Sequence, residues 1–292
     1  MEIIATLNEI DYLKALKQAG ADGIIFGGPF SLRFAYDAKE FHQITKFCKE
    51  NALKCYISID SFISEQDKPH LYRYLDAIKH LDPDGIYFTD LGVLNCAQAY
   101  GLQEKLIYDP DTLLANSLDT AFYLKNNIGA VLARELTLNE ITKIIDRFPN
   151  KLDLQVFGHL KLSYSKRKFL TNYFKHFAID AEVAERKDLS LVEESRSYRL
   201  PVVEDTYGTR IYSDYIFMMY RELVPLKAKL KRAIVDGSFL SENLFMTAIR
   251  DLKSLNAENA GYIEQALYDR FADENFSSGY LYRGTVKVKE DE

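Results

Sequence analysis

The chain has 292 residues, of which 47% are hydrophobic, so it can bury the core of one large domain or two small ones. A net charge of −6 argues against a protein that coats nucleic acid non-specifically, although it allows a local basic patch. The three cysteines, Cys48, Cys55 and Cys96, are odd in number and lack paired spacing, which predicts reduced thiols and a cytoplasmic location. No leader pattern and no apolar run of ~20 residues is found, so we expect no membrane contact.

Short apolar runs alternate with amphipathic segments along most of the chain. Strands are predicted at residues 3–7, 23–28, 54–60, 85–90, 105–109, 130–135, 152–159 and 232–236. Helices are predicted at residues 8–19, 37–52, 66–81, 117–127, 137–148 and 241–255, with Asn8 as one N-cap and capping boxes at Asp37 and Thr137. Alternating strands and helices imply parallel pairing, and their number favours a closed (β/α)8 TIM-barrel-like α/β fold.

The alternation breaks between the seventh and eighth strands. We therefore predict three parts: residues 1–160 with the first seven βα units, residues 161–230 as a basic and aromatic insertion at the carboxyl-end face, and residues 231–292 with the last unit and a tail. The insertion is expected to hold a basic helix at 166–177, an acidic connector at 180–194, a hairpin around Gly208 and a helix near 216–229. The tail reads as a helix followed by an edge strand with a charged end.

The active site of such a barrel lies at the carboxyl ends of its strands. Polar residues fall at those ends: Asp60, Asp90, Asp109, Arg134, Glu135, His159 and Asp236. We predict catalytic roles for Asp236, His159, Arg134 and Glu135, and Asp236 is the best single acid/base candidate because it is a lone carboxylate at a buried strand end. We predict that Asp60, Asp90 and Asp109 bind substrate. Several acids at one mouth could hold a divalent cation, but no ligand spacing supports this, so no metal is expected.

Each of these residues also has a purely structural interpretation. An aspartate at a strand end often caps the next helix, which could apply to Asp60 and Asp90. Arg134 and Glu135 could form an ion pair that only orders the mouth, and Asp236 could be a hydrogen-bonded structural residue. The pair Cys48 and Cys55 resembles a ligand spacing, yet it connects a helix with the bottom of a strand, which favours core packing.

Two segments carry features that suit an anionic ligand. After the second strand, Gly27 and Gly28 would let backbone N–H groups approach an anion, with Ser31 and Arg33 beside them. After the seventh strand, cations and aromatic rings alternate, and the predicted contacts are Lys161, Tyr164, Arg167, Lys168, Asn172 and Tyr173. Cations suit phosphates and rings stack on bases, and a second basic run at 227–232 strengthens the nucleic-acid interpretation. The alternative for either run is a solvated amphipathic helix.

Motifs along nearly the whole chain resemble the collagenase-like peptidase family of unknown catalytic type. The matching segments are 20–23, 27–33, 89–94, 133–138, 163–173, 204–209 and 276–280. The resemblance implies a barrel fold, a historical peptidase label and, for bacterial members, roles in RNA modification, notably hydroxylation of the tRNA wobble uridine.

The chain departs from this family at several positions. Relatives carry a cysteine cluster in the insertion that resembles an iron–sulfur site, whereas this chain has Lys161 and Lys168 at two of the positions and no cysteine after Cys96. Because thiolates hold such clusters, no iron–sulfur cofactor is expected. The family's Ile-Glu-Gly-Arg pattern reads Val235-Asp236-Gly237-Ser238, and a Ser-Thr-Gln stretch reads Asp109-Pro110-Asp111.

Three hypotheses follow. The chain could be the cluster-free partner of a paralogous family member in tRNA wobble-uridine hydroxylation, with tRNA as a further partner. It could instead be a peptidase, or a non-catalytic barrel whose 27–33 loop binds a small anion.

Overall fold

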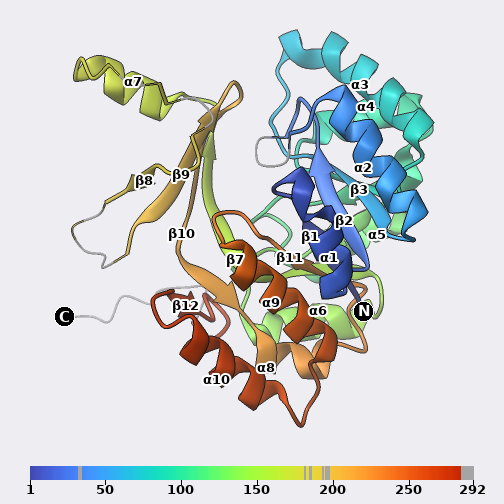
Figure 1. Ribbon diagram of the computed structural model, residues 1–292. Helices are drawn as coiled ribbons and strands as arrows, with labels where there is room; N and C mark the ends of the chain where they lie inside the picture. The colour runs from blue at the N-terminus through green and yellow to red at the C-terminus, as the bar shows by residue number, and fades with distance from the viewer. Residues whose placement is uncertain (32–34, 181, 184–185, 193, 195–197, 284–292) are drawn as a thin grey trace, which may run out of the picture.

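The computed structural model describes residues 1–31, 35–180, 182–183, 186–192, 194 and 198–283. Eight parallel strands form its centre: β1 (Glu2–Thr6), β2 (Gly23–Gly27), β3 (Lys54–Ile59), β4 (Gly85–Phe88), β5 (Leu106–Tyr108), β6 (Gly129–Val131), β7 (Leu152–Ser165) and β11 (Arg232–Val235). The barrel is closed because β11 pairs with both β1 and β7 (Figure 1). The predicted barrel with a long insertion before its eighth strand is therefore confirmed.

Helices follow most barrel strands and pack their apolar faces against the sheet. They are α1 (Leu13–Ala19), α2 (Ala38–Glu50), α3 (Lys68–Leu81), α4 (Leu91–Ala99), α5 (Ser117–Lys125), α6 (Leu138–Arg147) and α9 (Glu242–Ser254), with 3-10 turns η1 (Ile10–Tyr12), η2 (Glu65–Asp67) and η3 (Gln103–Lys105). The capping boxes predicted at Asp37 and Thr137 are present. The N-cap predicted at Asn8 is wrong, since its side chain accepts a hydrogen bond from Thr6 and α1 begins only after η1.

A buried ion pair closes the amino-terminal end of the barrel. The Arg232 Nε–H lies 2.8 Å from both carboxylate oxygens of Asp153, and the Tyr87 hydroxyl donates to the same carboxylate at 2.9 Å. Tyr56 completes the cluster, because its hydroxyl accepts a hydrogen bond from Arg232 at 3.2 Å. Among the described residues, none of the fully buried polar atoms of these four side chains lacks a hydrogen-bond partner, which suits a stabilising role at the face opposite the site.

The insertion is built around the continuation of β7 beyond the barrel. Its elements are α7 (Phe169–His176), β8 (Ser190–Leu191), β9 (Leu200–Asp205), β10 (Gly208–Met218), α8 (Tyr220–Leu223) and η4 (Val224–Leu226). β10 pairs antiparallel with β7 and also with β9, and it forms the hairpin expected at Gly208. We call the described part of residues 159–218 the arm, and its outer elements α7, β8 and β9 stand away from the barrel in Figure 1.

Two predicted boundaries in this region are wrong for the same reason. β7 does not end at His159 but runs to Ser165, and the helix predicted at 216–229 is strand as far as Met218. The sequence pattern predicts a loop after His159 and a helix from residue 216. Instead, the two segments pair as strands, and their backbone N–H and C=O groups form hydrogen bonds with each other. At the chain end, α10 (Ala260–Arg270) packs beside α8, and β12 (Phe276–Ser277) pairs with β10. The predicted charged end at 284–292 lies outside the described residues.

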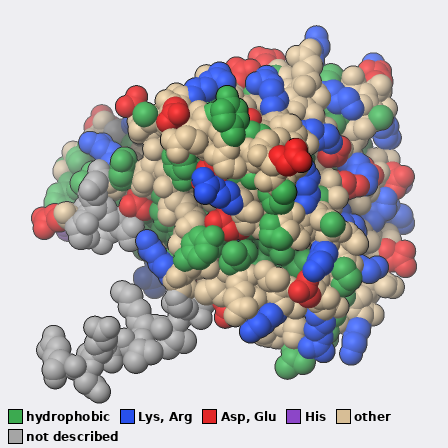
Figure 2. Space-filling model, turned by 90° about the horizontal axis from the view of Figure 1, so that it is seen from below, with side chains coloured by type: hydrophobic (Ala, Val, Ile, Leu, Met, Phe, Trp, Pro, Cys, Tyr) green, Lys and Arg blue, Asp and Glu red, His purple; other side chains and the backbone are tan. Residues whose placement is uncertain are grey.

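The surface seen from below carries interspersed acidic and basic side chains, without a field of one sign (Figure 2). Among the described residues no helix is long and apolar enough to span a membrane. A basic patch, where one exists, is therefore confined to particular helices or strands and does not extend over this face of the molecule.

Gly158 lets β7 leave the barrel beside β11. Its φ is +109°, and a Cβ placed there would overlap the Asp236 carbonyl oxygen. We predict that Gly158→Ala lowers the free energy of unfolding by at least about 3 kcal/mol in denaturant titration. The control is Gly101→Ala, where φ is +68° but no atom lies within 4 Å; it should cost only about 1 kcal/mol. Equal losses in the two variants would contradict a close approach at Gly158.

Candidate functional site

The mouth of the barrel holds a first group of four paired charges, which we call the rim cluster: Asp109, Asp111, Arg134 and Lys161. Arg134 forms ion pairs with Asp109, at 3.3 Å, and with Asp111, while Lys161 Nζ lies 2.6 Å from the second Asp111 oxygen. The Arg134 Nε–H donates to Gln155 Oε1 at 2.6 Å. The cluster therefore fixes the loop after β5, the end of β6 and the inner part of β7 relative to one another.

The rim cluster corrects one sequence interpretation and supports another. Arg134 pairs with Asp109 and Asp111, not with Glu135, which is exposed and forms no ion pair among the described residues. Burial raises the pKa of Asp109, and the guanidinium of Arg134 partly offsets this rise. Lys161 is not a loop residue, because it lies buried on β7. The predicted residues Arg134, Asp109 and Lys161 do meet, whereas Glu135 does not join them.

The second group, which we call the Arg210 clamp, ties the arm to the barrel. Arg210 extends from β10, is fully buried, and lies 3.9 Å from Asp60 after β3 and 3.6 Å from Asp205 at the end of β9. One of its terminal nitrogens donates to the Ser61 hydroxyl at 3.1 Å. Burial raises the pKa of Asp205, and the nearby Arg210 charge partly lowers it. Asp60 thus pairs with a distant cation instead of capping α3.

Aromatic rings continue the clamp toward the surface. The Arg210 guanidinium lies 4.3 Å from the centre of the Tyr164 ring, and the Phe62 ring stacks on Tyr164 at 4.5 Å. The Tyr164 hydroxyl accepts from the Phe62 N–H at 3.2 Å and donates to the Tyr207 carbonyl at 3.1 Å. Burial raises the pKa of Tyr164, although Arg210 acts in the opposite direction. Tyr164 is therefore held rigidly at the rim.

A pocket of about 220 Å³ opens beside Tyr164. Its polar lining is contributed by Thr89, Asp111, Thr112, Lys161 and Ser163, and its apolar lining by Phe62, Pro110, Leu113 and Leu162. Hydroxyls, an ion pair and an aromatic edge can together hold a small polar ring or a carbonyl group. Arg210 does not line this pocket, but its guanidinium lies against the Tyr164 ring that does.

His159 and Asp236 are brought together, as expected for residues on neighbouring strands. The His159 ring donates from Nδ1 to the Ser213 carbonyl at 2.8 Å, because a carbonyl oxygen can only accept. Burial lowers the pKa of His159, and the Asp236 carboxylate is among the groups that raise it. One oxygen of Asp236 accepts from the Ser238 N–H at 2.9 Å. His159 and Asp236 are therefore candidates for proton transfer, whereas Ser213 is fully buried and bonded to backbone groups.

Other residues predicted for the site have structural roles or lie outside the described residues. Asp90 is the N-cap of α4, accepting from Gly92 N–H at 2.7 Å and from Ile63 N–H at 2.9 Å. At Gly27 a Cβ would overlap Ser31, and at Gly28 it would lie 2.7 Å from the Tyr74 hydroxyl, so close packing explains both glycines. Ser31 is buried near the end of β2. Arg33 lies outside the described residues.

The remaining predicted contacts lie on the arm, away from the mouth. Arg167 and Lys168 precede α7, and Asn172 and Tyr173 lie on it; all four are exposed. They therefore form a second surface, which is joined to the pocket through β7.

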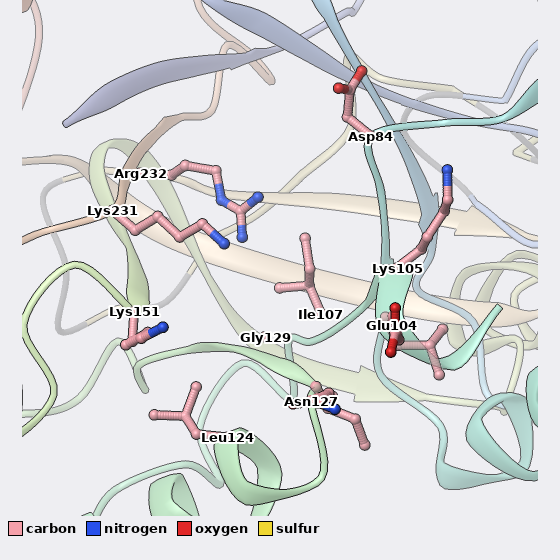
Figure 3. A pocket seen from close by; sticks show the side chains of 12 residues that line it. Asp84, Glu104, Lys105, Ile107, Leu124, Asn127, Gly129, Lys151, Lys231 and Arg232 are labelled. Carbon is pink, nitrogen blue, oxygen red and sulfur yellow. The ribbon is translucent and has the colours of Figure 1, made fainter.

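The second basic run does not join the first. Lys227 donates to backbone carbonyls at the end of α9, Lys229 pairs with Asp146, and Arg232 belongs to the buried plug. Figure 3 shows Lys231 and Arg232 in a pocket of about 370 Å³ that also holds Asp84 and Glu104. This pocket is at the amino-terminal ends of the strands, so the second basic run does not add to the surface formed by the first.

Sequence reasoning missed four residues of the mouth as site residues: Asp111, Gln155, Asp205 and Arg210. Asp111 and Asp205 lie in segments that were compared with the family's sequence pattern, 109–111 and 204–209. No local sequence signal indicated that either residue is part of the site. Arg210 sits on β10, 149 residues from its hydrogen-bond partner Ser61, and no spacing rule reaches that far.

The closed barrel with a charged carboxyl-end mouth defines a TIM-barrel-like α/β protein with an elaborated rim. Residues 8–285 match the family model Peptidase family U32, so the chain belongs to that family. A solved structure, that of the U32 peptidase Mk0906, is 14% identical and covers 81% of this chain and 92% of its own, with a TM-score of 0.50. That likeness supports the fold.

The curated relatives include tRNA hydroxylation proteins and a collagenase. The chain is 21% identical over 304 aligned residues to tRNA hydroxylation protein P2 of Bacillus subtilis, covering 98% of each chain. It is 23% identical to tRNA hydroxylation protein P1 of the same organism, over 59% of this chain and 42% of P1. It is 25% identical to a collagenase of Porphyromonas gingivalis, over 49% of this chain and 35% of that protein. The P2 match thus extends over the whole chain, whereas the others are partial.

Arg210→Met tests the clamp. Removing the guanidinium leaves Asp60 and Asp205 buried without that cation, which should lower the free energy of unfolding by about 3–5 kcal/mol and expose the arm to protease. Adding Asp205→Asn should recover part of the loss. The control, Arg186→Met, removes an exposed pair with Asp188 and should leave the stability nearly unchanged. If both variants are equally stable, Arg210 does not hold the arm.

The environment of His159 predicts a pH dependence. Because its pKa lies below the ordinary 6.5, the unfolded chain takes up a proton first, so stability should decrease as the pH falls through 6.5. NMR titration should place the His159 midpoint below 6.5, and Asp236→Asn should lower it further. In His159→Gln, this component of the pH dependence should be missing from the unfolding curves. A midpoint above 6.5 would contradict the burial argument.

Proposed function

We propose that this protein takes part in hydroxylation of the wobble uridine of tRNA. The observation that carries the proposal is the match to tRNA hydroxylation protein P2 over 98% of both chains. The pocket beside Tyr164 supports it, since hydroxyls, an ion pair and an aromatic edge are the groups with which proteins hold an unstacked base.

In this proposal a paralogous family member supplies the redox chemistry. An iron–sulfur cluster, which the resemblance implies for relatives, needs thiolates, and the residues at this mouth do not fit one. Lys161 is an ammonium ion paired with Asp111, and Lys168 is an exposed cation at the start of α7. The three cysteines are buried in α2, at the start of β3 and in α4. The chain itself would hold and orient RNA.

Peptidase activity is the second candidate, because His159 and Asp236 are an imidazole and a carboxylate on neighbouring strands. Hydrolysis would require this pair to activate a water, because Ser213 already donates to the Tyr215 carbonyl at 2.6 Å. The collagenase match covers only 49% of this chain, which gives it less weight than the P2 match.

Gene deletion followed by nucleoside mass spectrometry tests the proposal. Hydroxylated wobble uridine should fall in tRNA from the deletion strain and return when the native chain is supplied. Unchanged modification would rule the proposal out. Cleavage of casein or collagen peptides by the purified protein, lost in both His159→Gln and Asp236→Asn, would instead establish the peptidase.

A further inference from the structure

Helix α7 carries a row of exposed aromatic rings. Phe169, Tyr173 and Phe177 follow one another at helical spacing of four residues and are 46%, 55% and 58% exposed. The rings of Tyr173 and Phe177 lie 4.7 Å apart, so they form a continuous surface. We call these three residues the aromatic face. A single exposed ring is normal on a protein surface, whereas a contiguous row of exposed rings marks an interaction site.

The aromatic face is not needed to pack the arm. The neighbouring side of α7 buries Leu170 against Val183 and Val202, with Phe174 partly buried beside them. That small cluster holds the helix on β9 and β10. The three exposed rings therefore do not belong to the hydrophobic cluster that packs the arm.

Glu204 fixes the beginning of α7. Its buried carboxylate accepts from the N–H groups of Leu170, at 2.8 Å, and Thr171, at 3.0 Å, and from the Thr209 hydroxyl at 2.8 Å. Burial acts to raise the pKa of Glu204, but the hydrogen bonds from Thr171 and Thr209 outweigh it and lower the pKa below its usual value. The helix is thus held in place in advance, which reduces the entropy cost of binding.

The sequence segment that carries the aromatic face is basic. Residues 161–179 contain five lysines and arginines and no aspartate or glutamate, in a chain of net charge −6. Among the described residues, Arg167, Lys168 and Lys175 form no ion pair. A partner that offers planar rings and many negative charges matches both features, which favours a nucleic acid over an apolar protein face.

We propose that the aromatic face, together with Arg167, Lys168 and Lys175, is a docking surface for single-stranded RNA. Bases stack on Tyr173 and Phe177, and phosphates lie against the three cations. The inference rests on the proposed function for the choice of RNA as the nucleic acid. Because only four residues separate Tyr164, at the pocket, from the start of α7 at Phe169, one RNA loop can be held at both places.

Fluorescence anisotropy of the full chain with a labelled RNA hairpin tests the surface. The hairpin has a single-stranded loop, and a fully paired duplex of the same stem is the second probe. Tyr173→Ala with Phe177→Ala should weaken hairpin binding at least about fivefold and change duplex binding little, because stacking needs unpaired bases. Tyr173→Phe should retain binding. Arg167→Gln with Lys168→Gln should weaken both probes and reduce the dependence of binding on salt.

Matched controls separate this surface from general effects. Tyr262→Ala removes a ring that is 79% exposed on α10, and Lys14→Gln with Lys17→Gln removes two charges from α1; both should bind the hairpin as the native chain does. Unaltered hairpin binding by the aromatic variant, no binding by the native chain, or loss of a co-purifying protein without loss of RNA binding would each overturn the proposal. If deletion leaves tRNA modification unchanged while hairpin binding still depends on Tyr173, the proposed function fails and the docking surface stands.

Discussion

The structure depends on one strand that belongs to two units. β7 pairs with β6 and β11 inside the barrel and with β10 outside it. Gly158 allows the crossing, and Arg210 secures it by placing a buried cation between the barrel residue Asp60 and the arm residue Asp205. A buried guanidinium is costly unless it is paired, so the arm and the barrel stabilise each other's charges. The position of every functional surface follows from this junction.

The junction also explains why the mouth holds its charges in pairs. The rim cluster and the Arg210 clamp each combine acids with cations, and each contains a residue contributed by β7 or β10. Such an arrangement fixes geometry and offers hydrogen-bond donors, which suits holding a ligand. His159 and Asp236 lie on neighbouring strands at the point where β7 leaves the barrel, and they are the candidates for proton transfer.

Much of the barrel could be predicted, because its signals are local. The capping boxes at Asp37 and Thr137, and the alternation of apolar strands with amphipathic helices, depend only on neighbours in sequence. Part of the candidate site could also be predicted, because polar residues at strand ends are local signals. The residues found in this way at the mouth are Asp60, Asp109, Arg134, His159 and Asp236. Asp90 lies at a strand end too, but it is the N-cap of α4. The end of β7 was misplaced because a charged, aromatic stretch reads as a loop until its partner strand is known. Arg210 could not be predicted as a site residue, because its role depends on a contact with Ser61, which is 149 residues away in the sequence.

The central claim is that the arm and mouth of this chain handle tRNA. Ultraviolet cross-linking of the native protein to cellular tRNA, followed by mass spectrometry of the cross-linked peptides, tests it most directly. The account predicts cross-links within residues 161–179 and in the segments that line the pocket beside Tyr164. Cross-links confined to the pocket around Lys151 and Lys231 at the opposite end of the barrel, or no tRNA cross-links at all, would contradict it.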